Sequence, residues 1–190
     1  DPDLRGAASS ADAFRENLRR KGVEDAVTHH RMRSEELAPN WDRPIRFLWI
    51  DGDHTLRGAR TDLESFRPFL ADGAIVALHD ALHAFEGGVR VFAEDMLLSD
   101  DFGAAGVVGS IAWSQFHRDP AKTIHHRADK LDLYRRMARL IPLVAFGNRP
   151  KGLARTAFKI ARWRVPHGES QPERFFAQVV IGSWPRSIPG

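Results

Sequence analysis

The sequence contains no cysteine, and this absence excludes several kinds of site. Disulfide bonds, thiolate metal sites and cysteine nucleophiles all require a thiol, so none of them contributes to this chain. The same absence leaves the redox compartment undecided, because a chain without thiols reports nothing about oxidation.

Long apolar runs are also missing. No segment approaches the roughly 18 consecutive apolar residues that a membrane-spanning helix needs. No signal-peptide pattern is visible, and we expect a cytoplasmic protein. The chain begins Asp1-Pro2 without an initiator methionine, which favours a start that lies inside a longer polypeptide.

What is present is ordinary for a globular protein. The chain has 190 residues, of which 43% are hydrophobic and 28% charged. One domain is the default at this length, and the chain is long enough to bury a sizeable core.

Charge is distributed unevenly along the chain. Residues 1–116 hold 13 basic and 20 acidic side chains, whereas residues 117–164 hold 13 basic and 3 acidic ones. We therefore divide the chain into an α/β domain, 1–116, and a basic, largely helical C-terminal extension, 117–190, packed on the same domain. A basic segment suggests an anionic partner, although a solvated helical surface explains it equally well.

Apolar periodicity predicts alternating helices and strands through residue 116. A capping pattern at Ser9 and a stop signal at Gly22 delimit the first helix. Strands are expected at 26–32, 45–50, 74–78 and 105–113, and helices follow 34 and span 56–70, 89–97, 128–141 and 151–164. The order predicts a Rossmann-like parallel sheet with helices on both faces.

Two of the expected strands end in acidic residues and histidines. Asp51, Asp53 and His54 follow the strand at 45–50, and His79-Asp80 follows the strand at 74–78. The carboxyl ends of neighbouring parallel strands meet at one edge of a sheet, which is where ligands bind in such folds. The sequence therefore predicts a functional site at this edge.

The segments Ile50-Asp-Gly-Asp-His54, Arg60-Thr-Asp-Leu63 and Ala71-Asp-Gly-Ala-Ile-Val-Ala-Leu-His-Asp80 resemble class I S-adenosylmethionine-dependent methyltransferases. The nearest subgroup is bacterial and includes macrocin O-methyltransferase-like enzymes. The resemblance covers roughly residues 1–116. It implies S-adenosyl-L-methionine as the cofactor and a small-molecule or glycoside hydroxyl as the acceptor.

The sequence departs from this family in one respect. The family binds the cofactor's methionine part on a Gly-rich loop after its first strand, and this sequence has no such loop. We expect that the first strand, the loop and its helix lie upstream, which would make the domain N-terminally incomplete. By resemblance, the remaining cofactor-binding residues are Asp1 at the ribose hydroxyls, Ser34 near adenine, and Asp51.

The resemblance also implies a metal-assisted O-methylation. Asp51 and Asp80, with His79 as a third ligand, are the expected ligands of Mg²⁺ or another divalent cation. His54 is the candidate general base, because an imidazole accepts protons near neutral pH, and Asp51 is the second expected catalytic residue. Alternatively, Asp51 and Asp80 simply cap the helices that follow them.

Two rival functions remain open. Asp51-Gly-Asp53-His-Thr55 also fits the nucleophile motif of haloacid-dehalogenase-like phosphatases, in which Asp51 would attack phosphorus and Asp53 would act as acid and base. Because the Gly-rich loop is absent, the chain could instead be a non-catalytic module that binds an acidic partner through its basic C-terminal surface.

The basic segment 151–164 interleaves apolar and cationic residues at helical spacing. This pattern is typical of a helix that lies on an anionic membrane, and it also fits a homo-oligomer contact or a helix packed on its own domain. We expect no nucleic-acid partner.

Overall fold

A computed structural model describes residues 9–147, 149–169 and 172–179. The chain falls into two compact units, residues 1–40 and residues 41–190, and each is described by itself.

The first unit contains the helices α1 (Ser10–Lys21) and α2 (Ser34–Leu37). The predicted capping of α1 is confirmed: Ser9 Oγ accepts a hydrogen bond from the backbone N–H of Asp12, and Gly22 ends the helix at φ 66°. The predicted strand at 26–32 is wrong. These residues form an exposed loop after the 3₁₀ turn η2 (Glu24–Ala26), because no other strand in the described part of this unit is there to pair with them.

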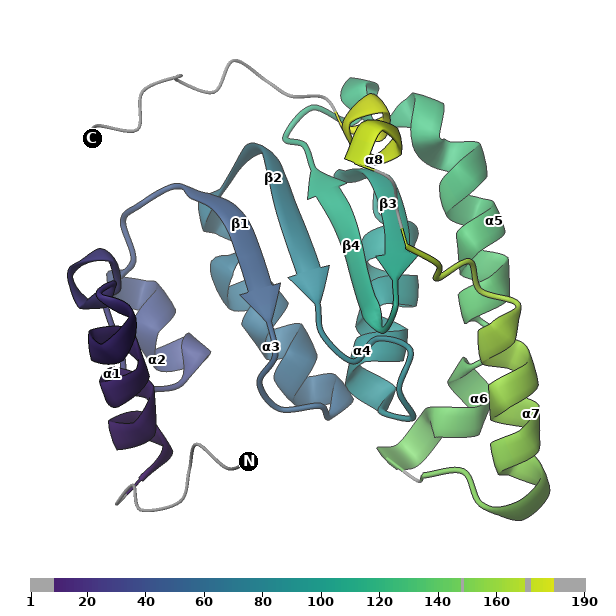
Figure 1. Ribbon diagram of the computed structural model, residues 1–190. Helices are drawn as coiled ribbons and strands as arrows, with labels where there is room; N and C mark the ends of the chain where they lie inside the picture. Colours follow the sequence, from purple (N-terminus) through teal and green to yellow (C-terminus); the bar gives the residue numbers. More distant parts are fainter. Residues whose placement is uncertain (1–8, 148, 170–171, 180–190) are drawn as a thin grey trace. The chain divides into compact units, whose positions relative to one another are not determined.

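The second unit is built on a four-stranded sheet in the order β1-β2-β4-β3 (Figure 1). The strands are β1 (Ile45–Ile50), β2 (Leu70–Leu78), β3 (Phe102–Val108) and β4 (Ile111–Phe116). β1 and β2 are parallel, whereas β4 is antiparallel to both of its neighbours. The fold is therefore α/β with a mixed sheet, and the prediction of a parallel sheet holds only for β1 and β2.

The predicted strand at 105–113 is two strands joined by a tight turn. Gly109 and Ser110 connect β3 to β4, and Gly109 has φ 62°, a left-handed conformation that glycine adopts without steric cost. Val108 pairs with Ile111 directly across this turn. The hairpin reverses the chain and makes β4 antiparallel to β2.

Helices cover one face of the sheet, whereas the described residues cover the other face only in part (Figure 1). Phe47 and Trp49 of β1 lie on that second face and are 57% and 44% exposed, so the prediction of helices on both faces holds only in part. One face packs on α3 (Leu56–Phe66), α4 (Glu86–Arg90) and the π-helical segment η5 (Val91–Leu97), around buried side chains that include Leu63, Val76, Leu78, Phe92 and Met96. On the other face, Trp113 contacts Phe175 of α8 (Pro172–Gln178), with 4.9 Å between the ring centroids. Alternate residues of one strand serve the two faces, as strand geometry requires.

The basic segment adds three helices to the same unit. They are α5 (Arg127–Met137), α6 (Ile141–Val144) and α7 (Gly152–Trp163). The helix predicted at 128–141 ends at Met137, and α6 begins beside Pro142. Leu133, Met137 and Phe158 join the main core beside the sheet. The division at residue 116 into domain and extension stays a prediction.

Short 3₁₀ segments complete the described elements. They are η3 (Ala38–Asn40), η4 (Arg67–Phe69), η6 (Pro120–Lys122), η7 (Ile124–His126) and η8 (Ala145–Gly147). In the part of the chain that the structure describes, no helix combines the length and apolar character needed to cross a bilayer.

Candidate functional site

The turns that follow β1 and β2 lie side by side. β1 and β2 are parallel and in register at Ile50 and Leu78, so the residues after them leave the sheet at the same edge. The backbone N–H of His79 donates to the carbonyl of Ile50, 3.0 Å away, and extends the pairing by one residue. The structure thus brings Asp51, His79 and Asp80 together, as the parallel pairing of the two strands predicts.

His79 lies between the two carboxylates. Its Nδ1 is 3.0 Å from Asp51 Oδ1 and 3.3 Å from Asp80 Oδ1. Nδ1 is buried but lacks the direction that a hydrogen bond to either oxygen requires. These contacts are close electrostatic approaches, so a rotation of the imidazole or of a carboxylate would be needed to form a hydrogen bond.

Asp80 is the most enclosed acid of the group. Its side chain is 14% exposed, and its Oδ1 lies 2.8 Å from His83 Nδ1, while its Oδ2 lies 3.9 Å from His54 Nε2. Its backbone has φ 55°, the left-handed region that few residues other than glycine enter. Strained conformations of this kind concentrate at functional sites, where the surrounding structure holds them.

His54 stacks on Phe85. The two rings are 4.6 Å apart between centroids and 18° from parallel. This contact fixes the plane of the imidazole and leaves its side chain about one third exposed. Sequence reasoning missed Phe85, because the 30 residues between it and His54 hide the contact from any local pattern.

Asp53 serves the start of α3. Its Oδ1 accepts a hydrogen bond from the Thr55 backbone N–H, and its Oδ2 accepts one from Thr55 Oγ1, both at 2.9 Å. Thr55 caps α3 by accepting from the Gly58 N–H at 3.1 Å. Both carboxylate oxygens of Asp53 are thus engaged locally, an arrangement that disfavours the acid–base role that the phosphatase reading gives Asp53.

Two glycines allow α4 to approach both site turns. A Cβ on Gly87 would lie 2.5 Å from the Thr55 carbonyl oxygen and 2.7 Å from that of His54. A Cβ on Gly88 would lie 2.8 Å from the Ala81 Cα. The sequence shows the Gly87-Gly88 pair, but only the structure gives its role, which is to let a helix backbone contact the turns that carry His54 and Asp80.

An ion-pair network ties α3 to the helical segment behind the site. Arg60 donates to Asp95 at 2.7 Å and to Glu94 at 3.2 Å, and Arg90 donates to Glu94 at 2.8 Å. The hydrogen bond from Arg90, aided by Arg60, lowers the pKa of Glu94. The network keeps Glu94 ionised and fixes α3, whose first turn follows His54.

The residues predicted to bind the cofactor are not placed in one described group. Asp1 lies outside the described residues, Ser34 is the first residue of α2 in the first unit, and Asp51 belongs to the second unit. Of the three, Asp51 alone is a member of the cluster at the end of β1. The assignments of Asp1 and Ser34 stay predictions.

The predicted metal site receives no support from ligand geometry. Among the described residues, no group of three or more histidines and acids is arranged to hold a metal ion. Asp51 Oδ1 lies 3.0 Å from His79 Nδ1, and Asp80 Oδ1 lies 2.8 Å from His83 Nδ1. The assignment of Asp51, Asp80 and His79 as ligands stays a prediction.

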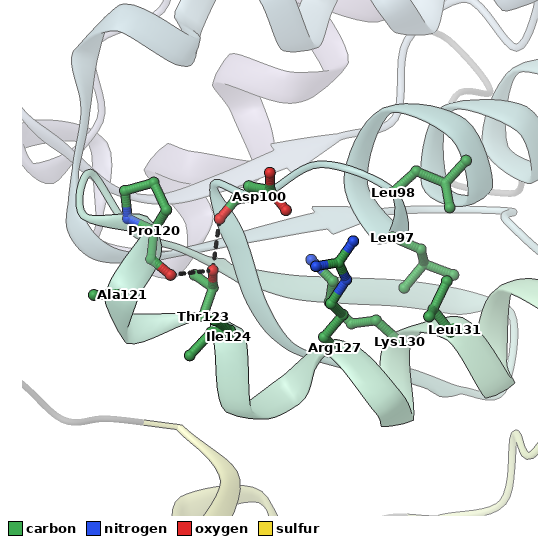
Figure 2. Close-up of a pocket in the computed structure, with 10 residues that line it drawn as sticks. All are labelled: Leu97, Leu98, Asp100, Pro120, Ala121, Thr123, Ile124, Arg127, Lys130 and Leu131. Atoms are coloured by element: carbon green, nitrogen blue, oxygen red, sulfur yellow. Dashed lines mark hydrogen bonds between the residues drawn. The ribbon is translucent and has the colours of Figure 1, made fainter.

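A separate pocket of about 310 Å³ lies between the end of η5 and α5 (Figure 2). Thr123 Oγ1 closes one wall by donating toward the carbonyl oxygens of Asp100 and Pro120. Lys130 lies at the pocket with its ammonium on the carbonyls of Ser99 and Phe102, and burial lowers its pKa. None of the site histidines or acids lines this pocket.

A family comparison covers the segment that carries both site turns. Residues 1–81 match a family model described as "Methyltransferase domain". The matched range includes β1, α3 and β2, together with Asp51, His54 and Asp80. Over residues 1–81 the chain is therefore similar to methyltransferase enzymes.

Proposed function

We propose that this chain carries part of an S-adenosylmethionine-dependent methyltransferase that methylates a hydroxyl of a small molecule, with a glycoside as the favoured class. The observation that carries the proposal is the convergence of Asp51, His54, His79 and Asp80 at one sheet edge, inside the segment that matches a methyltransferase domain. Relationship to the macrocin O-methyltransferase-like subgroup is part of the proposal.

The reaction needs an aligned acceptor and a place for its proton. When bound, the cofactor supplies an electrophilic methyl group, which the acceptor oxygen attacks as the carbon–sulfur bond breaks. His54 takes the hydroxyl proton, and the negative charge of Asp80, 3.9 Å from Nε2, stabilises the imidazolium that results. Stacking on Phe85 holds the imidazole in place for this transfer.

Proton transfer is assigned to His54 and not to a metal-bound group. The contacts of Asp51 and Asp80 with His79 do not leave a ready set of oxygen ligands, and Mg²⁺ requires near-octahedral oxygen coordination. A divalent cation that recruits Asp51, Asp80 and His79 would have to move these side chains first.

The test combines binding and turnover. Calorimetry with S-adenosylhomocysteine measures cofactor affinity, and formation of S-adenosylhomocysteine over a panel of glycosides and phenols measures methyl transfer. We expect His54→Gln to reduce turnover about 10²–10⁴-fold with little change in cofactor affinity, because a general base contributes that much. His29→Gln, which changes a histidine in edge-on contact with Phe14 in the first unit, is the matched control.

Three results would contradict the proposal in distinguishable ways. Absence of S-adenosylhomocysteine binding, both by this chain and by a version extended upstream of Asp1, would exclude S-adenosylmethionine as the cofactor. A metal, and not His54, would activate the acceptor if two results were obtained together. Chelation would abolish turnover and Mg²⁺ would restore it, and the His54→Gln variant would still be active. Hydrolysis of a phosphate monoester that Asp51→Asn abolishes would replace methyl transfer by the phosphatase reaction.

A further inference from the structure

Helix α7 presents a second apolar face that the described residues of its own unit leave exposed. Phe158 and Ala161 are buried in the core beside the sheet and give the helix one packed face. Leu153, Ile160 and Trp163 are 90%, 51% and 80% exposed. Steps of seven and three residues place these three side chains on one side of a helix, away from the packed side.

Phe146 is another exposed apolar residue, in the 3₁₀ segment η8 that follows α6. Its side chain is 91% exposed, and its backbone adopts a left-handed conformation at φ 65° and ψ 23°. A non-glycine residue pays a steric cost in this region. Because the Phe146 side chain is exposed and its backbone is strained, this residue does not stabilise the fold of the chain.

The segment around α7 carries one sign of charge. Residues 133–168 contain nine arginines and lysines and no aspartate or glutamate. Within the described residues, Lys151, Arg155 and Lys159 make no ion pair, so these cations are available to an external anion. Cations beside an apolar stripe are the pattern of a helix that lies in a membrane interface.

We propose that the outward face of α7, with Phe146, binds the surface of an anionic lipid membrane. Leu153, Ile160 and Trp163 enter the boundary between headgroups and acyl chains, where tryptophan is favoured. Lys151, Arg155 and Lys159 contact lipid phosphates, each strengthening binding about fivefold. α7 lies along the surface, because its packed face remains in the core of the second unit.

Charge and shape favour lipid over the other occupants. A symmetric contact of this face with the same face of a second copy would place two positively charged surfaces against each other, which is repulsive. A nucleic acid would neutralise the cations but offers little apolar surface to Leu153, Ile160 and Trp163. A bilayer supplies the anionic headgroups and the apolar interior together.

Vesicle flotation tests the proposal on the full chain and needs no bound cofactor. Vesicles of phosphatidylcholine and phosphatidylserine in equal parts should carry the protein upward, whereas vesicles of phosphatidylcholine alone should not. Added salt should weaken the binding, since exposed charges are screened. The double variant Leu153→Ser/Trp163→Ser should lower affinity at least tenfold, because each side chain loses its apolar burial.

Charge-reversal variants show whether vesicle binding depends on the α7 surface or on the net charge of the whole chain. Arg155→Glu/Lys159→Glu should weaken vesicle binding about thirtyfold or more. Lys21→Glu/Arg31→Glu makes the same change in charge on exposed residues of the first unit and should retain most of the binding. Thermal melting of each variant confirms that it is folded.

Two outcomes would overturn the proposal. One is equal loss in the α7 and control charge variants, which would make the attraction a property of net charge. The other is no vesicle binding combined with tight binding to a polyanionic peptide or RNA that Arg155→Glu/Lys159→Glu abolishes. That second result would show that the surface binds an acidic macromolecule and not a membrane.

Discussion

The substitution Gly87→Ala tests whether close packing of α4 holds the two site turns in place. The backbone of Gly87 lies in a helical turn that alanine can adopt, so the change adds one methyl group and no backbone strain. That methyl group would lie 2.5 Å from the Thr55 carbonyl oxygen and 2.7 Å from that of His54. Both contacts are with backbone atoms, which cannot rotate away as a side chain can.

Three contributions set the expected size of the effect. Overpacking of this kind costs about 1–3 kcal/mol. Displacing α4 also stretches the hydrogen bond from the Gly87 N–H to the His54 carbonyl, 3.0 Å long, which contributes about 1 kcal/mol. The better helix propensity of alanine offsets about 0.5–1 kcal/mol. The net loss is about 2 kcal/mol, or a fall in Tm of about 4–8 °C for a chain of this length.

Urea unfolding and calorimetric melting measure this loss, and Gly168→Ala is the matched control. A Cβ on Gly168 meets no atom within 4 Å, so its replacement should change stability by less than about 0.5 kcal/mol. Equal midpoints for wild type, Gly87→Ala and Gly168→Ala would refute the claim that α4 is held against the His54 turn by this contact.

Three further predictions concern buried groups and a helix cap. Burial lowers the pKa of His117 and of His126, so the unfolded chain binds more protons than the folded one, and stability should decline as the pH falls below about 6.5. His117→Gln should flatten that decline in urea titrations at acidic and neutral pH, and an unchanged slope would contradict it. Leu63→Ala should cost about 2–5 kcal/mol in urea unfolding, because Leu63 is fully buried; a loss below 1 kcal/mol would show that the core closes around the cavity. Thr55→Ala should cost about 1 kcal/mol by removing the acceptor of the Gly58 N–H, and Thr55→Ser, which keeps that acceptor, should restore most of it.

The elements predicted correctly are those whose signals are local. The caps of α1 at Ser9 and Gly22 are a few residues from the helix they delimit, and the apolar spacing of Leu56, Ala59 and Leu63 belongs to one helix face. The juxtaposition of Asp51 with Asp80 was also predictable, since parallel pairing of two neighbouring strands fixes where their ends meet.

The errors have two causes. The prediction of one strand over residues 105–113 missed the dipeptide Gly109-Ser110, which lies between two apolar runs and is a two-residue hairpin signal. The direction of β4 relative to β2 depends on the reversal of the chain at that dipeptide. Phe85 and Gly87 contribute to the site through contacts with a turn about thirty residues earlier in the chain, beyond the reach of short-range patterns.

The left-handed backbone at Phe146 implies that the thermal stability of the protein and its affinity for membranes oppose each other at this residue. Phe146→Gly would relieve a steric cost of about 1–2 kcal/mol at this position. Glycine's greater freedom in the unfolded chain offsets about 0.5–1 kcal/mol of this gain, so the Tm should rise slightly. The same change would remove an aromatic ring from the surface that we assign to membrane contact. A variant selected only for heat resistance would therefore be expected to lose affinity for lipid, and a screen that measures both properties should find them moving in opposite directions at this residue.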